Sequence, residues 1–136
     1  MRIRFAAFVA GLGLIVAALP VAAHHSFNAE YDTNKPITLK GAVTKIEWKN
    51  PHTYFYIDVK DETGKVTNWG LEMGSPNALM RAGWSRNSMK VGQEVVVEGS
   101  RAKDGSDLAN VKAVTLGGQR LFGASSGTDQ PETPVR

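Results

Sequence analysis

Three histidines are the residues with the clearest chemical potential in this sequence. His24 and His25 are adjacent, and His52 lies in a predicted turn that follows Asn50-Pro51. Imidazole nitrogens bind divalent transition metals, and a free amine on His24 would add the kind of nitrogen ligand that Cu(II) prefers. The pattern therefore predicts a metal site of His24, His25 and His52, with copper as the candidate metal. Short histidine clusters are only compositional signals, so the alternative stays open: the pair is an accident of a cleavage region, and His52 is a turn residue bonded to backbone.

A second candidate site is the outer face of two predicted strands. In the segment 53–59, Tyr54 and Tyr56 alternate with core-type residues, and Asn68 takes the same outward parity in the segment 66–73. Tyrosine combines an apolar ring with a polar tip, which suits stacking on a sugar, a base or a peptide. The predicted ligand-binding residues are Tyr54, Tyr56, Asn68, Asn50 and His52. The competing interpretation is that aromatic residues favour strands for packing alone.

Catalysis is disfavoured by what the sequence lacks. It has no cysteine, no carboxylate pair, no phosphate-binding glycine loop and no zinc-protease string. Ser75 is better explained as a helix cap, since Pro76 follows it at a position suited to the first helical turn. Glu72 stands at the end of an otherwise apolar strand and is either a ligand or a helix-capping partner. We predict no catalytic residue and no enzymatic activity.

The first 23 residues have the features of an export signal. Arg2 and Arg4 precede an apolar stretch over residues 5–19, and Val21-Ala22-Ala23 places small residues where a signal peptidase cuts. The apolar stretch is too short to span a bilayer comfortably. We therefore expect cleavage after Ala23, a periplasmic or secreted protein beginning at His24, and no membrane anchor after cleavage.

The charge balance argues against nucleic acid as a partner. The chain has 16 basic and 13 acidic residues, which gives a net charge of +3. Without Arg2 and Arg4, 14 basic residues remain against 13 acidic ones, and their signs alternate along the chain. A nucleic-acid-binding domain normally carries a basic patch or stripe, so we expect a small molecule or a protein as the partner. We also expect a monomer.

Hydrophobic periodicity predicts five strands and one short helix. The first strand starts near Pro36 and carries a bulge at Thr44-Lys45, where the apolar parity changes. The expected domains are a signal peptide (1–23), an N-terminal segment (24–35), a β domain (36–122) and a disordered tail (123–136). The expected elements are strands near 37–48, 53–59, 66–73, 94–100 and 108–116, a helix starting at Pro76 and ending at Gly83, and a docked segment at 119–122.

This order of elements predicts a mostly β fold. A helix between the third and fourth of five strands is typical of the OB-fold, a small and partly open barrel. A β-sandwich would need about seven strands. Trp48, Trp69 and Trp84 are assigned mainly to the core and to helix docking, because large rings contribute most to burial in a small domain.

Several unusual strings give the sequence a family resemblance. They are Ala23-His24-His25-Ser26-Phe27, Gly41-Ala42-Val43-Thr44, Glu47-Trp48, Asn50-Pro51-His52, Glu72-Met73-Gly74-Ser75-Pro76-Asn77, Gly83-Trp84 and Val97-Glu98-Gly99-Ser100. In this order they resemble an uncharacterised family of small exported bacterial proteins. The resemblance implies export and a similar fold, and it implies no activity. The sequence thus favours an exported, non-catalytic binding module for a small molecule, glycan or partner protein; the alternative is a periplasmic copper-binding protein.

Overall fold

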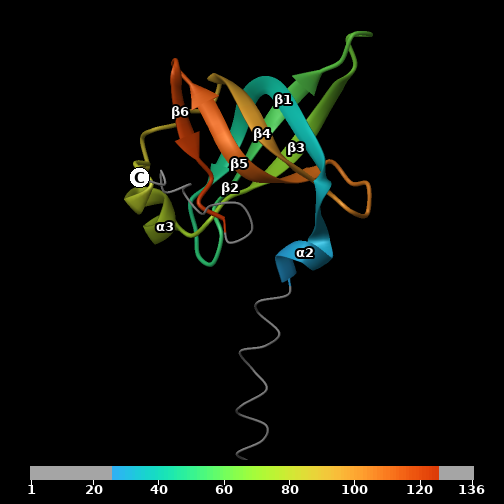
Figure 1. Cartoon of the computed structure of the whole chain (residues 1–136). Coiled ribbons are helices and arrows are strands. Elements are labelled where there is room, and N and C mark those ends of the chain that lie inside the picture. Colours follow the sequence, from blue (N-terminus) through green and yellow to red (C-terminus); the bar gives the residue numbers. More distant parts are fainter. Residues whose placement is uncertain (1–25, 126–136) are drawn as a thin grey trace, which may run out of the picture.

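The computed structural model describes residues 26–125, which form a mostly β protein with two short helices (Figure 1). The elements are α2 (Ser26–Glu30), β1 (Tyr31–Glu47), β2 (Tyr54–Lys60), β3 (Val66–Glu72), α3 (Pro76–Arg81), β4 (Glu94–Ala102), β5 (Leu108–Leu116) and β6 (Gln119–Phe122). Figure 1 shows α2 in blue below the strands at the start of β1, and α3 in olive beside the end of β6.

The strands form one sheet that closes on itself. Their order is β3-β2-β1-β4-β5-β6, and an additional parallel pairing joins β3 to β5, so that the first five strands make a ring. The remaining pairings are antiparallel. The mostly β class is confirmed, but residues 26–125 contain six strands rather than five. The extra strand is β6, expected only as a docked segment, which pairs with β5 outside the ring.

The bulge and the helix cap that the sequence predicts are present in the structure. The register of β1 against β2 shifts between Val43 and Lys45, which confirms the predicted bulge. The Ser75 hydroxyl caps α3 by accepting a hydrogen bond from the Ala78 N–H at 3.2 Å, and Pro76 opens the helix. Gly83 follows the helix with a φ of +95°, a conformation that L side chains rarely adopt.

The core lies inside the ring of strands. Residues of the predicted inward parity on β2 and β3 are buried there, among them Phe55, Ile57, Trp69 and Leu71. Trp84 is also buried, and Trp48 packs partly buried against the same cluster. The three tryptophans therefore contribute to the core or its edge, as the sequence predicted.

Both ends of the described segment pack against the strands. β1 begins at Tyr31, five residues before Pro36, and Tyr31 is buried. After β6 the Gly123 carbonyl accepts a hydrogen bond from the Gly74 N–H at 2.7 Å. A Cβ on Gly74 would lie 2.0 Å from the Ala124 carbonyl oxygen, so this close approach requires glycine.

The predicted export signal (1–23), the pair His24 and His25, and most of the predicted tail (126–136) lie outside the described residues. Across residues 26–125, none of the helices has both the length and the apolar character needed to cross a membrane.

Candidate functional site

A buried carboxylate organises the candidate site. Glu72, the last residue of β3, is only 5 % exposed although its parity points it to the outside of the ring. Its carboxylate accepts a hydrogen bond from the Tyr31 hydroxyl with one oxygen and contacts His52 Nδ1 with the other. A buried carboxylate is costly unless donors satisfy it, so these two contacts explain how Glu72 is accommodated there.

Strand register extends the site into a row of outward-facing residues. Tyr54 on β2 pairs with Glu72 on β3, Glu72 pairs with Asn110 on β5, and Asn110 pairs with Ser100 on β4. Paired residues project from the same side of a sheet. Ser100, Asn110 and Glu72 are 7 %, 2 % and 5 % exposed. Polar residues on the outer face of a sheet are usually in contact with solvent. In this row, however, three neighbouring polar residues are buried.

The N-terminal segment brings Tyr31 to Glu72. α2 precedes Tyr31 directly, and the rings of Phe27 and Tyr31 lie 5.6 Å apart between centroids. The Lys103 N–H donates to the Glu30 carbonyl at 2.8 Å, which fixes the end of α2 against the β4–β5 loop. Burial, and next the bond to Glu72, raise the pKa of the Tyr31 hydroxyl far above its ordinary value of 10.0. Tyr31 is therefore a protonated donor at neutral pH.

The β1–β2 loop positions His52. The next residue, Thr53, receives a backbone hydrogen bond from the Met73 N–H at 2.9 Å and donates one to the Gly74 carbonyl at 3.0 Å. These bonds join the loop to the chain just after Glu72, which places the two side chains together. The His52 side chain remains 44 % exposed. Because Nδ1 faces Glu72, the neutral imidazole is held with Nδ1 as donor and Nε2 as acceptor.

The two predicted tyrosines lie beside this cluster with lysines over their rings. Lys49 Nζ is 5.9 Å from the Tyr54 ring centroid, and Lys45 Nζ is 5.4 Å from that of Tyr56. Both tyrosines are half-buried. Burial, together with the nearby Glu72 carboxylate, raises the pKa of Tyr54 well above 10.0. Glu47 lies between the two lysines, at 2.6 Å from Lys45 and 3.1 Å from Lys49, and these contacts lower its pKa to about 2.

The predicted ligand-binding residues fall into two groups. His52 and Tyr54 lie at Glu72, whereas Tyr56 pairs with Gly70 and its hydroxyl donates to Glu47 at 3.4 Å. Asn68 lies four residues before Glu72 on β3, where its amide donates to Asp58 at 2.8 Å and to Thr44 at 3.1 Å. Asn50 is exposed in the β1–β2 loop. The Asn68 amide is therefore already bonded to Asp58 and Thr44, on the same face but away from Glu72.

Sequence reasoning left out two residues of this cluster, Tyr31 and Asn110, and gave Glu72 an incomplete description. Tyr31 and Asn110 were not singled out, because each joins the site through a pairing between distant parts of the chain. The helix-capping alternative for Glu72 is wrong, since Ser75 is the cap. The alternative in which His52 bonds to backbone is also wrong, because its partner is the Glu72 carboxylate. The signal in the sequence was the position of Glu72, a charged residue at the end of an otherwise apolar strand.

The described residues can hold an imidazole in a fixed orientation but not a complete metal site. Between residues 26 and 125 there is no cluster of three or more histidine, cysteine, aspartate or glutamate side chains that could hold a metal ion. The other two predicted ligands, His24 and His25, are outside this range. The arrangement is thus suited to donating one nitrogen, His52 Nε2, to a bound group.

The comparisons with known proteins identify the family. The chain belongs to a family of unknown function (DUF6152), whose model matches residues 11–110. This range contains Tyr31, His52, Glu72 and Asn110. A comparison with curated proteins gives no match.

Proposed function

We propose that this protein is an exported, non-catalytic binding module with an OB-fold. Its ligand, a small molecule, glycan or partner protein, contacts the β1–β2 loop and the outer face of β2 and β3. The observation that carries the proposal is the His52 imidazole: the buried Glu72 carboxylate, which pairs with Tyr54, orients it while the side chain stays 44 % exposed. A rigidly held polar group beside aromatic rings is the usual composition of a recognition site.

The topology supports the choice of fold and of face. The ring order, the parallel β3–β5 pairing and a helix between β3 and β4 match the OB-fold arrangement. OB-folds bind ligands on the face of strands two and three and with the loops between strands one and two and between four and five. His52 stands in the first of these loops, and Tyr54 and Tyr56 lie on that face.

The chemistry of the site restricts its ligand. In the neutral form of the imidazole Nε2 accepts a hydrogen bond, and this form suits a ligand that presents a hydroxyl or N–H there. Lys45 and Lys49 lie against the tyrosine rings, so a flat ligand must displace a lysine to stack on the face that it covers. The Tyr54 ring edge and the His52 imidazole are the contacts that we expect first.

A fragment experiment tests the proposal. The mature protein would be titrated with monosaccharides, free amino acids and dipeptides while amide signals are followed by two-dimensional NMR. We expect binders that shift the signals of His52 and Tyr54, with affinity lost in His52→Ala and Tyr54→Ala. Lys65→Ala, in the β2–β3 hairpin turn, is the control that should bind normally. Binders that shift only other regions, or full binding by His52→Ala, would contradict the assigned face.

Export is the part of this proposal that rests on the sequence features of residues 1–23. Mass spectrometry of protein isolated from a periplasmic fraction would give the mature N-terminus. We expect a chain that starts at His24. A cytoplasmic chain that retains Met1 would contradict export.

A second candidate function is copper binding, and the His52–Glu72 contact favours it. Metal-ligating histidines usually donate their second ring N–H to a carboxylate, which fixes the orientation of the coordinating nitrogen. His52 has this arrangement. In the sequence, His24 and His25 immediately precede α2, which leads into the Glu72 partner Tyr31. Cu(II) would then take nitrogen ligands from His52, the two N-terminal histidines and the free amine.

The copper proposal has its own test. Untagged protein that starts at His24 would be titrated with Cu(II) and Zn(II), beside a form with one extra residue before His24 and beside His52→Ala. We expect tight Cu(II) binding that both changes weaken. Binding no stronger than that of exposed histidines in general would exclude copper binding as the function. It would not affect the proposal of a ligand on the face of β2 and β3.

A further inference from the structure

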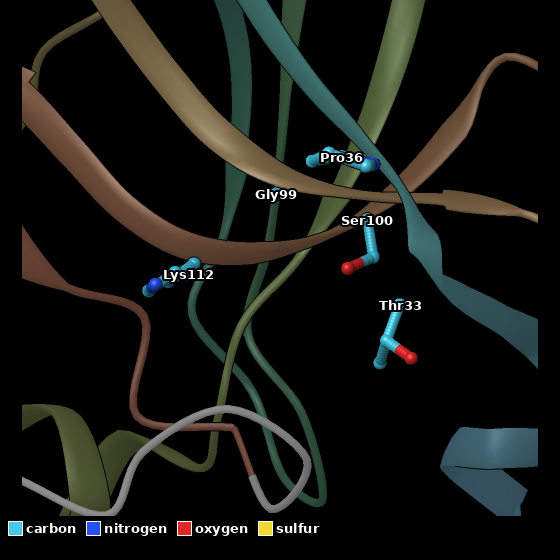
Figure 2. A pocket seen from close by; sticks show the side chains of 5 residues that line it. All are labelled: Thr33, Pro36, Gly99, Ser100 and Lys112. Carbon is cyan, nitrogen blue, oxygen red and sulfur yellow. The ribbon is translucent and has the colours of Figure 1, made fainter.

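A pocket on the outer side of β4 and β5 includes Ser100, at one end of the row of outward-facing residues described above, and His52 does not line it. It has a volume of about 270 Å³, and its lining residues are Thr33, Pro36, Gly99, Ser100 and Lys112. Figure 2 shows Thr33 and Pro36 on the first part of β1, Gly99 and Ser100 on β4, and Lys112 on β5 across the opening. Three strands therefore contribute to one small cavity.

Two irregularities in strand pairing create this space. The register between β1 and β4 shifts between Tyr31 and Pro36, which lifts the Thr33 region away from regular pairing. The register between β4 and β5 shifts between Glu98 and Gly99. A Cβ on Gly99 would lie 2.2 Å from the Asn110 carbonyl oxygen, so only glycine allows this close approach. Bulges of this kind commonly redirect side chains near binding sites.

Ser100 is the polar group that points into the pocket. It is 7 % exposed, and Figure 2 shows its hydroxyl directed into the space between Thr33 and Lys112. Among residues 26–125 its side chain makes no hydrogen bond, and the hydroxyl of Thr33 makes none either. Buried polar groups normally have a partner. The Ser100 hydroxyl is therefore available to donate to a group that enters the pocket.

Charge determines which acceptor fits. Lys112 supplies a positive charge, and within the described part of the chain its ammonium group forms no ion pair. None of the five lining residues is acidic. The Ser100 hydroxyl and the Lys112 cation, which line one small cavity, are complementary to a negatively charged oxygen group.

We propose that this pocket binds a small oxyanion: a phosphate, a sulfate or a carboxylate group. A pocket of about 270 Å³ is close to the lower limit for small-molecule sites, about 300 Å³. It therefore accommodates a free oxyanion or the charged end of a larger molecule. In this proposal the Ser100 hydroxyl donates to the anion, the long side chain of Lys112 brings its ammonium group over the opening, and Thr33 forms part of the wall. The site does not depend on the function proposed for His52.

The test is a titration with three simple anions. Inorganic phosphate, sulfate and acetate would each be added to the protein at low ionic strength, with amide signals followed by NMR. We expect saturable shifts at Gly99, Ser100 and Lys112. Affinity should fall about tenfold in Lys112→Gln, as expected on loss of a charge-assisted hydrogen bond, and survive in Lys112→Arg. Lys65→Gln, which removes an exposed charge in the β2–β3 hairpin, is the matched control.

Each outcome decides the proposal or its ligand class. Binding of phosphate and sulfate without acetate assigns the pocket to tetrahedral anions, and binding of acetate assigns it to carboxylates. Ser100→Ala should weaken binding of whichever anion binds. Equal weakening by Lys112→Gln and Lys65→Gln would show non-specific attraction and overturn the site, as would the absence of saturable shifts at this pocket. The anion titration does not depend on the His52→Ala experiment. One proposal can therefore be contradicted while the other stands.

Discussion

Two carboxylates flank Tyr54 on the outside of the strand ring, and their surroundings are opposite. Glu47 on β1 and Glu72 on β3 both pair with Tyr54 in register. The Glu47 side chain is 23 % exposed and contacts two lysines, whereas that of Glu72 is 7 % exposed and contacts Tyr31 and His52. Exposed lysines thus neutralise Glu47, whereas hydrogen-bond donors from Tyr31 and His52 hold the buried Glu72.

The comparison shows how one residue type can have two roles in a single row. Exposed ion pairs are screened by water and salt and constrain little. A buried carboxylate must be satisfied, and its partners are therefore fixed in position. Glu72 consequently determines where Tyr31 and His52 point, while Glu47 mainly adjusts the local charge.

The largest expected effect is on stability when Glu72 is removed. Glu72→Ala deprives the buried Tyr31 hydroxyl and the His52 N–H of their acceptor, so we expect a loss of about 3 kcal/mol in the free energy of unfolding. Urea denaturation measures it. Glu47→Ala is the matched control and should have a much smaller effect, because its partners are exposed lysines. Equal losses in the two variants would contradict the distinction between the two carboxylates.

Removing only the Tyr31 hydroxyl should have a smaller effect. Tyr31→Phe keeps the ring contact with Phe27 but leaves one Glu72 oxygen without its donor. We expect a loss of about 2 kcal/mol in unfolding free energy. Tyr56→Phe is the control, because the Tyr56 hydroxyl lies at a long 3.4 Å from Glu47 on the partly exposed side of the row. A Tyr31→Phe protein as stable as wild type would show that the bond does not hold Glu72.

The same hydroxyl predicts a dependence of stability on alkaline pH. The pKa of Tyr31 is raised by folding, so the folded state keeps this proton at pH values where the unfolded state loses it. The stabilisation is complete below pH 10, the unfolded value, and is lost as the pH rises above it. Tyr31→Phe should therefore show a flatter decline above pH 10 in denaturation experiments. An unchanged slope would contradict the buried, protonated state of Tyr31.

The smallest effect is expected at Glu47 under acid conditions. Its pKa is lowered to about 2 by Lys45 and Lys49, so its contribution is present above pH 4.5 and is lost as the pH falls towards 2. Water and salt screen this partly exposed group and its exposed lysines, and the change in stability should be slight. Carboxyl NMR titration should give a pKa below the usual range that rises with added NaCl. A normal pKa at low salt would show that the lysines do not hold this carboxylate.

Local patterns in the sequence predicted most of the fold. Alternation assigned Phe55 and Tyr54 to opposite faces, the change of parity located the bulge of β1, and Ser75-Pro76 marked the start of α3. These features depend on residues close together in the chain. The mostly β class could be predicted because the order of these elements along the chain can be inferred from the same local patterns.

The candidate site was only partly predictable because its contacts join distant segments. Tyr31 and Glu72 are 41 positions apart, and no periodic pattern connects them. The parallel pairing that places Asn110 beside Glu72 arises from closure of the ring, which strand patterns do not specify. The sequence marked His52 and Glu72 as unusual residues, but their contact required the three-dimensional structure.

The most direct test of the account is the protonation pattern of the His52 imidazole at neutral to mildly alkaline pH. Long-range proton–nitrogen NMR separates the two neutral tautomers. We expect the proton on Nδ1, facing Glu72, and the free lone pair on Nε2, where a ligand can use it. Glu72→Ala should release this preference. A neutral His52 protonated on Nε2 in the wild-type protein would contradict the claim that Glu72 orients the imidazole for binding.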